Sequence, residues 1–218
     1  MLEPETIDIA TPTVQLRVLS WGREDAPIAL CLHGFPDTAH GWRKIAPMLV
    51  DAGWRVVAPF MRLVATWPRQ LTRSWYILYF QLPWLPERSA KWVVPRLWRR
   101  WSPGYRADED LRHVDNAIGT PDRWRAALGY YRAAVRNTKP PADYAELHQH
   151  WMSAPVVPTL YLHGTDDGCA TADYAHWVEK ILPDGGEVDV VEHAGHFLQL
   201  DQPEAVGRRI VDFVGQPR

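Results

Sequence analysis

The stretch Ile28-Ala29-Leu30-Cys31-Leu32-His33-Gly34-Phe35-Pro36-Asp37 decides the fold. Its first five residues are apolar without interruption, which predicts a strand over Ile28–Leu32 that is buried on both faces, as in a parallel sheet. Gly34 then allows the backbone to approach a ligand closely, and an exposed N–H here is able to receive a developing oxyanion. A His-Gly-x-Pro sequence alone is equally compatible with a tight turn between a strand and a helix.

The residues on either side extend this pattern. Val14–Trp21 alternates and predicts a strand, Trp42–Ala52 has one apolar face and predicts a helix that stops at Gly53, and Arg55–Pro59 predicts another short buried strand. Strands interleaved with a helix indicate an α/β protein with a mostly parallel sheet and helices on its faces.

The same alternation returns near the C-terminus. Thr159–His163 and Glu187–Glu192 read as strands, whereas Ala170–Leu182 and Pro203–Val214 read as helices. Between the two parts lie helical stretches without a convincing buried strand, at 71–82, 86–101, 107–117, 121–136 and 142–152. The sequence therefore predicts a sheet domain at 1–68 and 155–218, with a helical lid inserted at 69–154.

Composition restricts the classes of function. A chain of 218 residues allows one substantial core, and its net charge of −2 gives no electrostatic case for nucleic acid or membrane partners. Cys31 and Cys169 do not make a disulfide framework, and the acidic N-terminus is unlike a signal peptide. We expect a cytoplasmic protein, with a homo-oligomer left open.

Tryptophan is unusually frequent, with 12 residues in the chain. Many of these fall in the middle of the chain, at Trp67, Trp75, Trp84, Trp92, Trp98, Trp101 and Trp124. They are interpreted either as a core built from large rings or as an aromatic wall over an apolar substrate pocket.

Two loops after the C-terminal strands carry acid and base candidates. Leu162-His163-Gly164-Thr165-Asp166-Asp167-Gly168 places an acid at the end of a strand, where ligand sites of open α/β sheets lie. Glu192-His193-Ala194-Gly195-His196-Phe197 places a histidine after the next strand. The acids are also compatible with a helix-capping turn, and a lone loop histidine is often only a solvated side chain. The order of acid and then histidine favours a catalytic pair.

Taken together, these motifs resemble the α/β-hydrolase superfamily, and within it the epoxide-hydrolase-like branch that includes haloacid and haloalkane dehalogenases. The resemblance runs from about Val14 to the end of the chain. It implies that Phe35, within the His33-Gly34-Phe35-Pro36 motif, donates a backbone hydrogen bond to the oxyanion, that Asp167 is the acid and that His196 is the base. Asp166 is the weaker candidate for the acid, and His193 is a supporting candidate.

The lid carries further resemblance. Ser74-Trp75-Tyr76-Ile77-Leu78-Tyr79-Phe80-Gln81-Leu82-Pro83 looks like the first lid helix of epoxide hydrolases, which implies that Tyr76 polarises the epoxide oxygen. Leu128-Gly129-Tyr130-Tyr131-Arg132 is similar to the element that supplies a second tyrosine, here Tyr131. Both tyrosines are also compatible with a purely structural place in the lid core.

No catalytic nucleophile is found where the family has one. The family's nucleophile lies on a Gly-x-[Ser/Asp]-x-Gly elbow before the lid, yet no glycine lies between Gly53 and Gly104. Val56–Arg62 reads as one strand with its exit and Leu63–Pro68 as the end of another, although parallel neighbours need a crossover of roughly 10–12 residues. We therefore expect that a central strand and the elbow are missing at Arg62-Leu63.

The resemblance implies a hydrolase that opens a small apolar epoxide through a covalent ester, which water activated by His196 and Asp167 then hydrolyses. Without a nucleophile this chain is expected to be impaired or inactive. A non-catalytic remnant with an aromatic pocket, or an esterase or dehalogenase acting on an ester or halide, stays open. No cofactor or metal is implied, because His148 and His150 lack the spacing of a zinc hydrolase.

Overall fold

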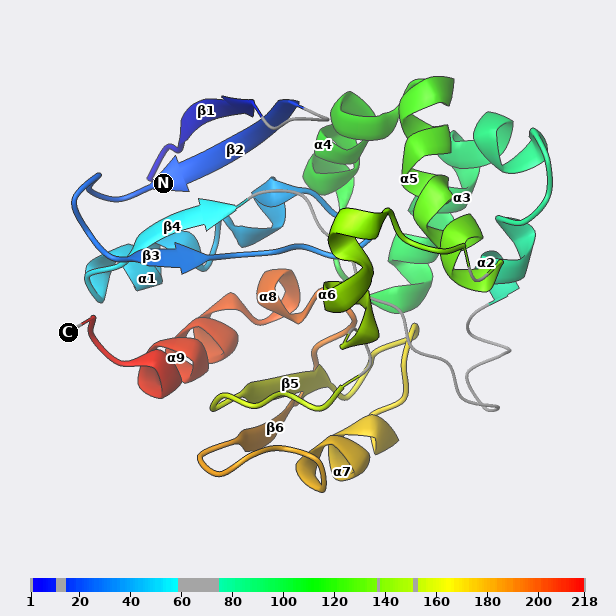
Figure 1. Cartoon of the computed structure of the whole chain (residues 1–218). Helices are drawn as coiled ribbons and strands as arrows, with labels where there is room; N and C mark the ends of the chain where they lie inside the picture. The colour runs from blue at the N-terminus through cyan, green and yellow to red at the C-terminus, as the bar shows by residue number, and fades with distance from the viewer. Residues whose placement is uncertain (1, 11–14, 59–74, 137, 151–152, 218) are drawn as a thin grey trace.

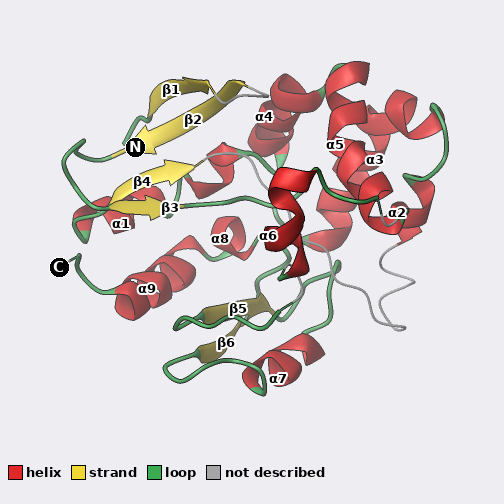
Figure 2. Cartoon of the chain, viewed as in Figure 1, coloured by secondary structure: helices red, strands yellow, loops and turns green. Residues whose placement is uncertain are grey.

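The computed structural model describes residues 2–10, 15–58, 75–136, 138–150 and 153–217. Its strands form two separate sheets (Figures 1 and 2). The first has the order β1-β2-β4-β3, built from β1 (Glu5–Ala10), β2 (Gln15–Trp21), β4 (Arg55–Ala58) and β3 (Ile28–Leu30). The second pairs β5 (Leu160–Gly164) with β6 (Glu187–Val191).

Two pairs of strands are parallel, as the sequence predicts, whereas the strands nearest the N-terminus pair antiparallel. β3 pairs parallel with β4, and β5 parallel with β6. β2 is antiparallel to both β4 and β1, and the sequence analysis did not predict β1. The missed strand has mostly exposed side chains, so it lacks the buried apolar pattern that identifies the others.

Four helices lie beside these strands. They are α1 (Ala46–Asp51), α7 (Asp173–Glu179), α8 (Leu198–Asp201) and α9 (Pro203–Val214). The helix predicted over Trp42–Ala52 is split into a 3-10 turn at Ala39–Trp42, labelled η1, and the short α1. Gly53 follows α1 with φ +97°, a left-handed conformation that confirms the predicted stop.

The central segment is helical, as predicted, and gathers on one side of the strands (Figure 1). It contains α2 (Trp75–Tyr79), α3 (Leu85–Trp101), α4 (Asp108–Ile118), α5 (Pro121–Val135), the 3-10 turn η3 (Ala142–Tyr144) and α6 (Ala145–Gln149). The lid boundaries at 69 and 154 stay a prediction. The junction Arg62-Leu63 and Trp67 lie outside the described residues. No described helix has the length and apolarity to cross a membrane.

Large rings make up the core of this helical segment. Trp98, Trp101 and Trp124 are each 1% exposed and share one cluster with Tyr76 and Tyr131. In contrast, Trp84 and Trp92 are 60% and 66% exposed. The interpretation of the tryptophans as core therefore holds for the first three and not for the last two.

β3 differs from the prediction of a strand buried on both faces. Ala29 and Cys31 pack toward α1 and α9, but Ile28 and Leu30 are 60% and 59% exposed. Among the described residues, no helix covers the face on which these two side chains lie. An apolar run indicates that both faces of a strand are suited to burial. It does not show that a helix or another strand is present to cover each face.

α9 connects the two sheets. Its buried Val206 belongs to the cluster formed by β2, β4 and α1, and Leu162 of β5 packs against the same cluster. Gly207 allows the close approach, because a Cβ atom there would lie 2.2 Å from the Sδ atom of Met48. The two sheets are thus held by one shared helical layer rather than by a strand among the described residues.

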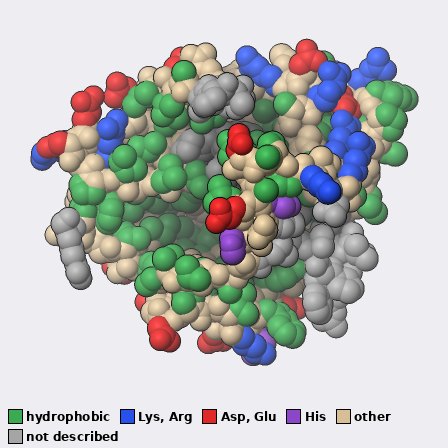
Figure 3. All heavy atoms as spheres, viewed as in Figure 1, with side chains coloured by type: hydrophobic (Ala, Val, Ile, Leu, Met, Phe, Trp, Pro, Cys, Tyr) green, Lys and Arg blue, Asp and Glu red, His purple; other side chains and the backbone are tan. Residues whose placement is uncertain are grey.

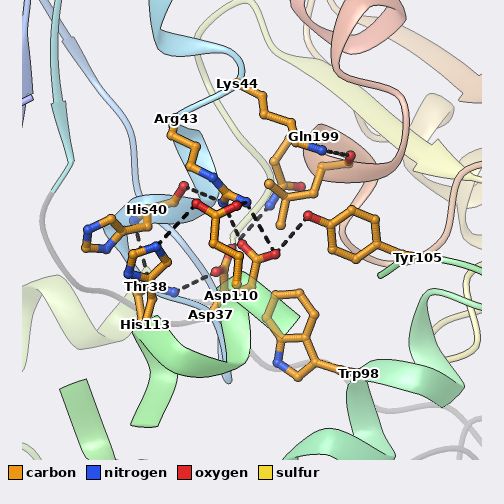
Figure 4. A network of polar contacts seen from close by, with 12 residues as sticks. Asp37, Thr38, His40, Arg43, Lys44, Trp98, Tyr105, Asp110, His113 and Gln199 are labelled. Atoms are coloured by element: carbon orange, nitrogen blue, oxygen red, sulfur yellow. Dashed lines mark hydrogen bonds and ion pairs between the residues drawn. The ribbon is translucent and has the colours of Figure 1, made fainter. Parts of the chain in front are cut away.

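A buried ion pair fastens the lid to the sheet domain (Figure 4). Arg43, which follows η1, donates to Asp110 of α4 at 2.5 Å, and their side chains are 9% and 1% exposed. Tyr105 also donates to Asp110, at 2.8 Å, and the Arg43 guanidinium contacts Glu109 at 3.1 Å. Because Asp110 is almost fully buried, its charge depends on these partners.

We predict that Arg43→Met destabilises the protein by on the order of 3 kcal/mol, because it leaves the Asp110 carboxylate buried without its cation. The free energy of unfolding, measured with urea at pH 7, checks this. Arg43→Met/Asp110→Leu should recover part of the loss, and Arg17→Met, at an exposed ion pair with Asp8, should change little. Equal effects of Arg43→Met and Arg17→Met would contradict the role given to the buried pair.

Candidate active site

Asp167 and His196 form a hydrogen-bonded pair at the ends of β5 and β6. The Nδ1 atom of His196 lies 3.0 Å from Oδ2 of Asp167, although 29 residues separate them in sequence. An ionised carboxylate only accepts, so Nδ1 carries the proton and Nε2 is left as a base. Asp167 is buried, whereas 31% of the His196 side chain is exposed. This is the geometry of an acid that orients a general base.

The second oxygen of Asp167 is held by the backbone. Oδ1 accepts from the amides of Cys169 at 2.6 Å and Ala170 at 2.9 Å. Burial alone would raise the pKa of Asp167, but the hydrogen bond from His196 and those two amides outweigh burial and hold the pKa below its ordinary value. The acid is therefore ionised at neutral pH and keeps a fixed orientation.

The C-terminal end of α3 holds both loops of the pair. The carbonyl oxygen of Trp101 accepts from the amide of His196 at 2.8 Å and from that of Gly168 at 3.1 Å. Gly168 has to lack a side chain, because a Cβ atom would lie 1.8 Å from the backbone oxygen of Arg100. Ser102 adds a hydrogen bond from the amide of Phe197 to its Oγ, at 3.0 Å. The lid thus sets the positions of acid and base together.

The loop after β3 reaches the same cluster. Pro36 accepts from Nε1 of Trp98 at 3.2 Å, and the Phe35 ring packs edge-on against Tyr131 with centroids 5.1 Å apart. His33 is buried with Nδ1 2.8 Å from the Gly34 oxygen, and burial lowers its pKa. This loop, which carries His33, Gly34, Phe35 and Pro36, therefore lies next to the lid, and its role at an oxyanion stays a prediction.

Asp37 ends this loop and is 3% exposed. Burial raises its pKa to about 7, although the amide of Thr38 and Gln199 of α8 both donate to it (Figure 4). It joins the loop after β3 to the segment that follows His196.

The two lid tyrosines lie side by side. The rings of Tyr76 and Tyr131 have centroids 5.8 Å apart, and both residues are about 5% exposed. Tyr76 contacts the Trp101 ring at 5.1 Å, which in turn contacts His196 at 5.1 Å. Burial, and then Tyr131 and Cys169, raise the pKa of Tyr76 far above its ordinary value, so its phenol stays protonated and able to donate.

The other sequence candidates lie apart from this pair. Asp166 is exposed and accepts from Thr165 at 3.3 Å, so Asp167 is the acid that the geometry favours. The His193 side chain is exposed, and its backbone has φ +57°. The sequence analysis interpreted Trp98 and Trp101 as core or pocket wall, and it did not predict that they and Ser102 position the two loops. A backbone acceptor or a supporting indole leaves no motif in a sequence.

One cluster among the described residues is compatible with a metal ion. Ligand atoms of Asp167, Cys169 and His196 lie within 4.8 Å of one another. Both Asp167 oxygens, however, already accept hydrogen bonds from the protein. The donor set therefore fits a hydrogen-bonded acid–base pair better than a metal centre.

Aromatic rings fill much of the space around these groups. Cavities of about 480 Å³ and 280 Å³ are present elsewhere, the first beside Lys44 and Tyr105 and the second beside Val94 and Trp124. Neither is lined by Asp167, His196, Tyr76 or Tyr131.

We predict that Asp167→Asn lowers the free energy of unfolding in a pH-dependent way. The folded-state pKa of Asp167 is lowered, so its stabilising contribution is fully present above the ordinary value of 3.8 and is lost as pH falls through the folded pKa. Urea unfolding of wild type and variant at several pH values from 3 to 7 checks this. A difference that does not shrink at acid pH would contradict the ionised, hydrogen-bonded acid.

The chain is similar to several known proteins. The AB hydrolase superfamily protein YfhM of Bacillus subtilis is 23% identical, with 94% of this chain and 96% of that protein covered. Epoxide hydrolase A of Mycobacterium tuberculosis is 22% identical with the same coverage. The crystal structure of a loop variant of a haloalkane dehalogenase from Bradyrhizobium elkanii superposes with a TM-score of 0.74 at 16% identity, over 97% of each chain.

The alignment with the B. subtilis protein also contains gaps. It spans 285 positions, whereas 94% of the 218 residues of this chain is about 205, so about 80 positions have no residue here. A profile of the Alpha/beta hydrolase family matches residues 61–209, which include the acid, the base and the lid tyrosines. The chain belongs to the α/β hydrolase family.

Proposed function

We propose that the site is that of an epoxide hydrolase, acting on a small apolar epoxide. The observation that carries the proposal is the cluster that joins Tyr76 and Tyr131 to the Asp167–His196 pair through Trp101. Two phenols side by side are suited to donate hydrogen bonds to an oxygen that becomes an alkoxide. Epoxide hydrolase A of M. tuberculosis, one of the relatives, supports this choice.

The residues present would supply the groups that bind the epoxide oxygen and the groups that hydrolyse the ester, but not the attacking carboxylate. Tyr76 and Tyr131 would donate to the epoxide oxygen while a carboxylate attacks carbon, so that the C–O bond breaks and a covalent ester forms. The N–H of Phe35 would hold the ester oxygen as it becomes negative. His196, oriented by Asp167, would take a proton from water, and that water would cleave the ester to release a diol.

The carboxylate that attacks the epoxide carbon is not identified. No described residue beside this cluster is assigned as the nucleophile. A serine in that role would give an esterase instead, so the epoxide assignment depends on the lid tyrosines. The same gap makes a non-catalytic protein with an aromatic pocket the second candidate.

Turnover of styrene oxide and of p-nitrophenyl acetate tests the proposal. We predict slow diol formation that falls to background in His196→Ala, because the general base is lost, and by about 100-fold in Tyr76→Phe, because one oxyanion donor is lost. Tyr79→Phe, a lid tyrosine bonded to Ser89, serves as the control and should keep the activity.

Circular dichroism and urea unfolding establish that each variant is folded. No epoxide turnover by a well-folded protein would overturn the enzyme proposal in favour of the non-catalytic one. Ester hydrolysis alone, lost in His196→Ala and unaffected in Tyr76→Phe, would replace the epoxide assignment with an esterase.

A further inference from the structure

β5 has an apolar face and a polar face. Leu162 packs against the cluster of α1, β2, β4 and α9, and Figure 3 shows hydrophobic side chains on the side of the molecule where Figure 1 places β3 and β5. Because successive side chains of a strand point to opposite faces, Tyr161 and His163 lie on the other face of β5. Tyr174 of α7 acts electrostatically on Tyr161, so this polar face is turned toward α7.

His163 is buried between two polar groups on this face. Its side chain is 5% exposed, and Nε2 lies 3.6 Å from Oδ2 of Asp167. On the other side of the ring, Nδ1 lies 2.7 Å from the hydroxyl oxygen of Tyr161. The first distance is longer than a hydrogen bond, so His163 acts on Asp167 electrostatically. The oxygen that it faces is the one that accepts from Nδ1 of His196.

Tyr161 decides which nitrogen of His163 carries the proton. Burial, and then Asp167 and Tyr174, raise the pKa of Tyr161 to about 12, so its phenol keeps its proton at neutral pH. A phenol that donates to Nδ1 leaves the single N–H of a neutral imidazole on Nε2. The opposite tautomer would turn the lone pair of Nε2 toward the negative oxygen of Asp167, which is unfavourable. The contacts therefore favour an N–H of His163 directed at the acid.

The groups around Asp167 differ in how firmly they are held. Oδ1 accepts from the backbone amides of Cys169 and Ala170. Oδ2 lies between two imidazoles, of which His196 is 31% exposed and His163 is 5% exposed. A general base at the edge of the protein has to gain and lose a proton, whereas a buried neutral imidazole keeps its place and its charge state. His163 is thus the fixed neighbour of the oxygen that orients the base.

We propose that His163 is a positioning residue for the acid, with Tyr161 fixing its tautomer. As a neutral imidazole protonated at Nε2, it keeps Oδ2 of Asp167 directed toward His196 and helps to keep that carboxylate ionised. It neither touches substrate nor exchanges a proton during the reaction. Its effect on turnover, and that effect alone, rests on the proposed function.

The tautomer is tested by the ¹⁵N chemical shifts of His163 in the full chain at pH 7, assigned with His163→Gln. A protonated and an unprotonated ring nitrogen differ widely in shift. We expect the Nε2–H tautomer in the wild type and a mixture of both tautomers in Tyr161→Phe, because the phenol no longer donates to Nδ1. Tyr174→Phe is the matched control, since it removes a neighbouring phenol and leaves the contact between Tyr161 and His163 in place.

The effect on the acid is tested by titrating the ¹³C carboxyl signal of Asp167, assigned with Asp167→Asn, from pH 7 down to the onset of acid unfolding. We expect the midpoint to rise by about half a unit or more in His163→Leu, because the N–H beside Oδ2 is lost. His163→Gln, whose side-chain amide is able to take the place of Nε2–H, should restore most of the midpoint. His176→Leu, at an exposed histidine of α7, should leave the midpoint unchanged.

The comparison of leucine with glutamine separates a positioning role from simple packing. An equal rise of the midpoint in both variants would show that the volume of His163 matters and its N–H does not, which overturns the proposal. An unchanged midpoint in folded His163→Leu overturns it as well. If His163→Leu does not fold, the wild-type tautomer decides, because an Nδ1–H tautomer is incompatible with the proposed contact.

Styrene oxide turnover is measured on the same proteins. We expect kcat to fall by about tenfold in His163→Leu with KM unchanged, because the base is misaligned and substrate contacts are not altered. The expected tautomer and midpoints without diol formation by the wild type would uphold the role of His163 and contradict the proposed function. Diol formation together with an Nδ1–H tautomer and an unchanged midpoint would do the reverse.

Discussion

The carbonyl oxygen of Trp101 is the acceptor on which the candidate site depends. It receives the amides of Gly168 and His196, which belong to loops that follow two different strands. A carbonyl has two lone pairs, and here both are used to hold the acid loop and the base loop at one point. The hydrogen bond between Asp167 and His196 follows from this, since neither loop is free to shift without losing a buried backbone bond.

The same helix also carries the aromatic part of the site. Trp98 and Trp101 are one helical turn apart, and they contact the loop after β3 and the ring of Tyr76 respectively. The lid is anchored to the sheet domain at its other side by the buried pair of Arg43 and Asp110. With two attachment points of this kind, the lid acts as a structural part of the site rather than as a loose cover.

The sheet is the part of the molecule that is least complete among the described residues. α9 and the lid hold the four-stranded and two-stranded sheets together. Among the described strands, β3 and β5 each have one partner strand and one edge left open, and Ile28 and Leu30 of β3 are exposed. The residues that position acid, base and phenols do not depend on a further strand at these edges. This explains how the chain retains a well-formed acid–base pair while no nucleophile is found beside it.

By itself the sequence determined the family resemblance and the helical character of the central segment, and it predicted the two loops that carry the acid and base candidates. Those features are encoded locally: a buried apolar run, a glycine in a tight turn, and an acid and a histidine that each end a strand. It did not predict β1, whose side chains are mostly exposed, nor the exposed face of β3, because an apolar run does not supply its own cover. Only the tertiary structure decided between Asp166 and Asp167, brought Tyr76 to Trp101 and His196, and identified Trp101 as the shared acceptor. Such contacts join residues that are far apart in the chain, through backbone atoms and ring faces. Every residue has a backbone and many residues have rings, so no sequence motif marks these contacts.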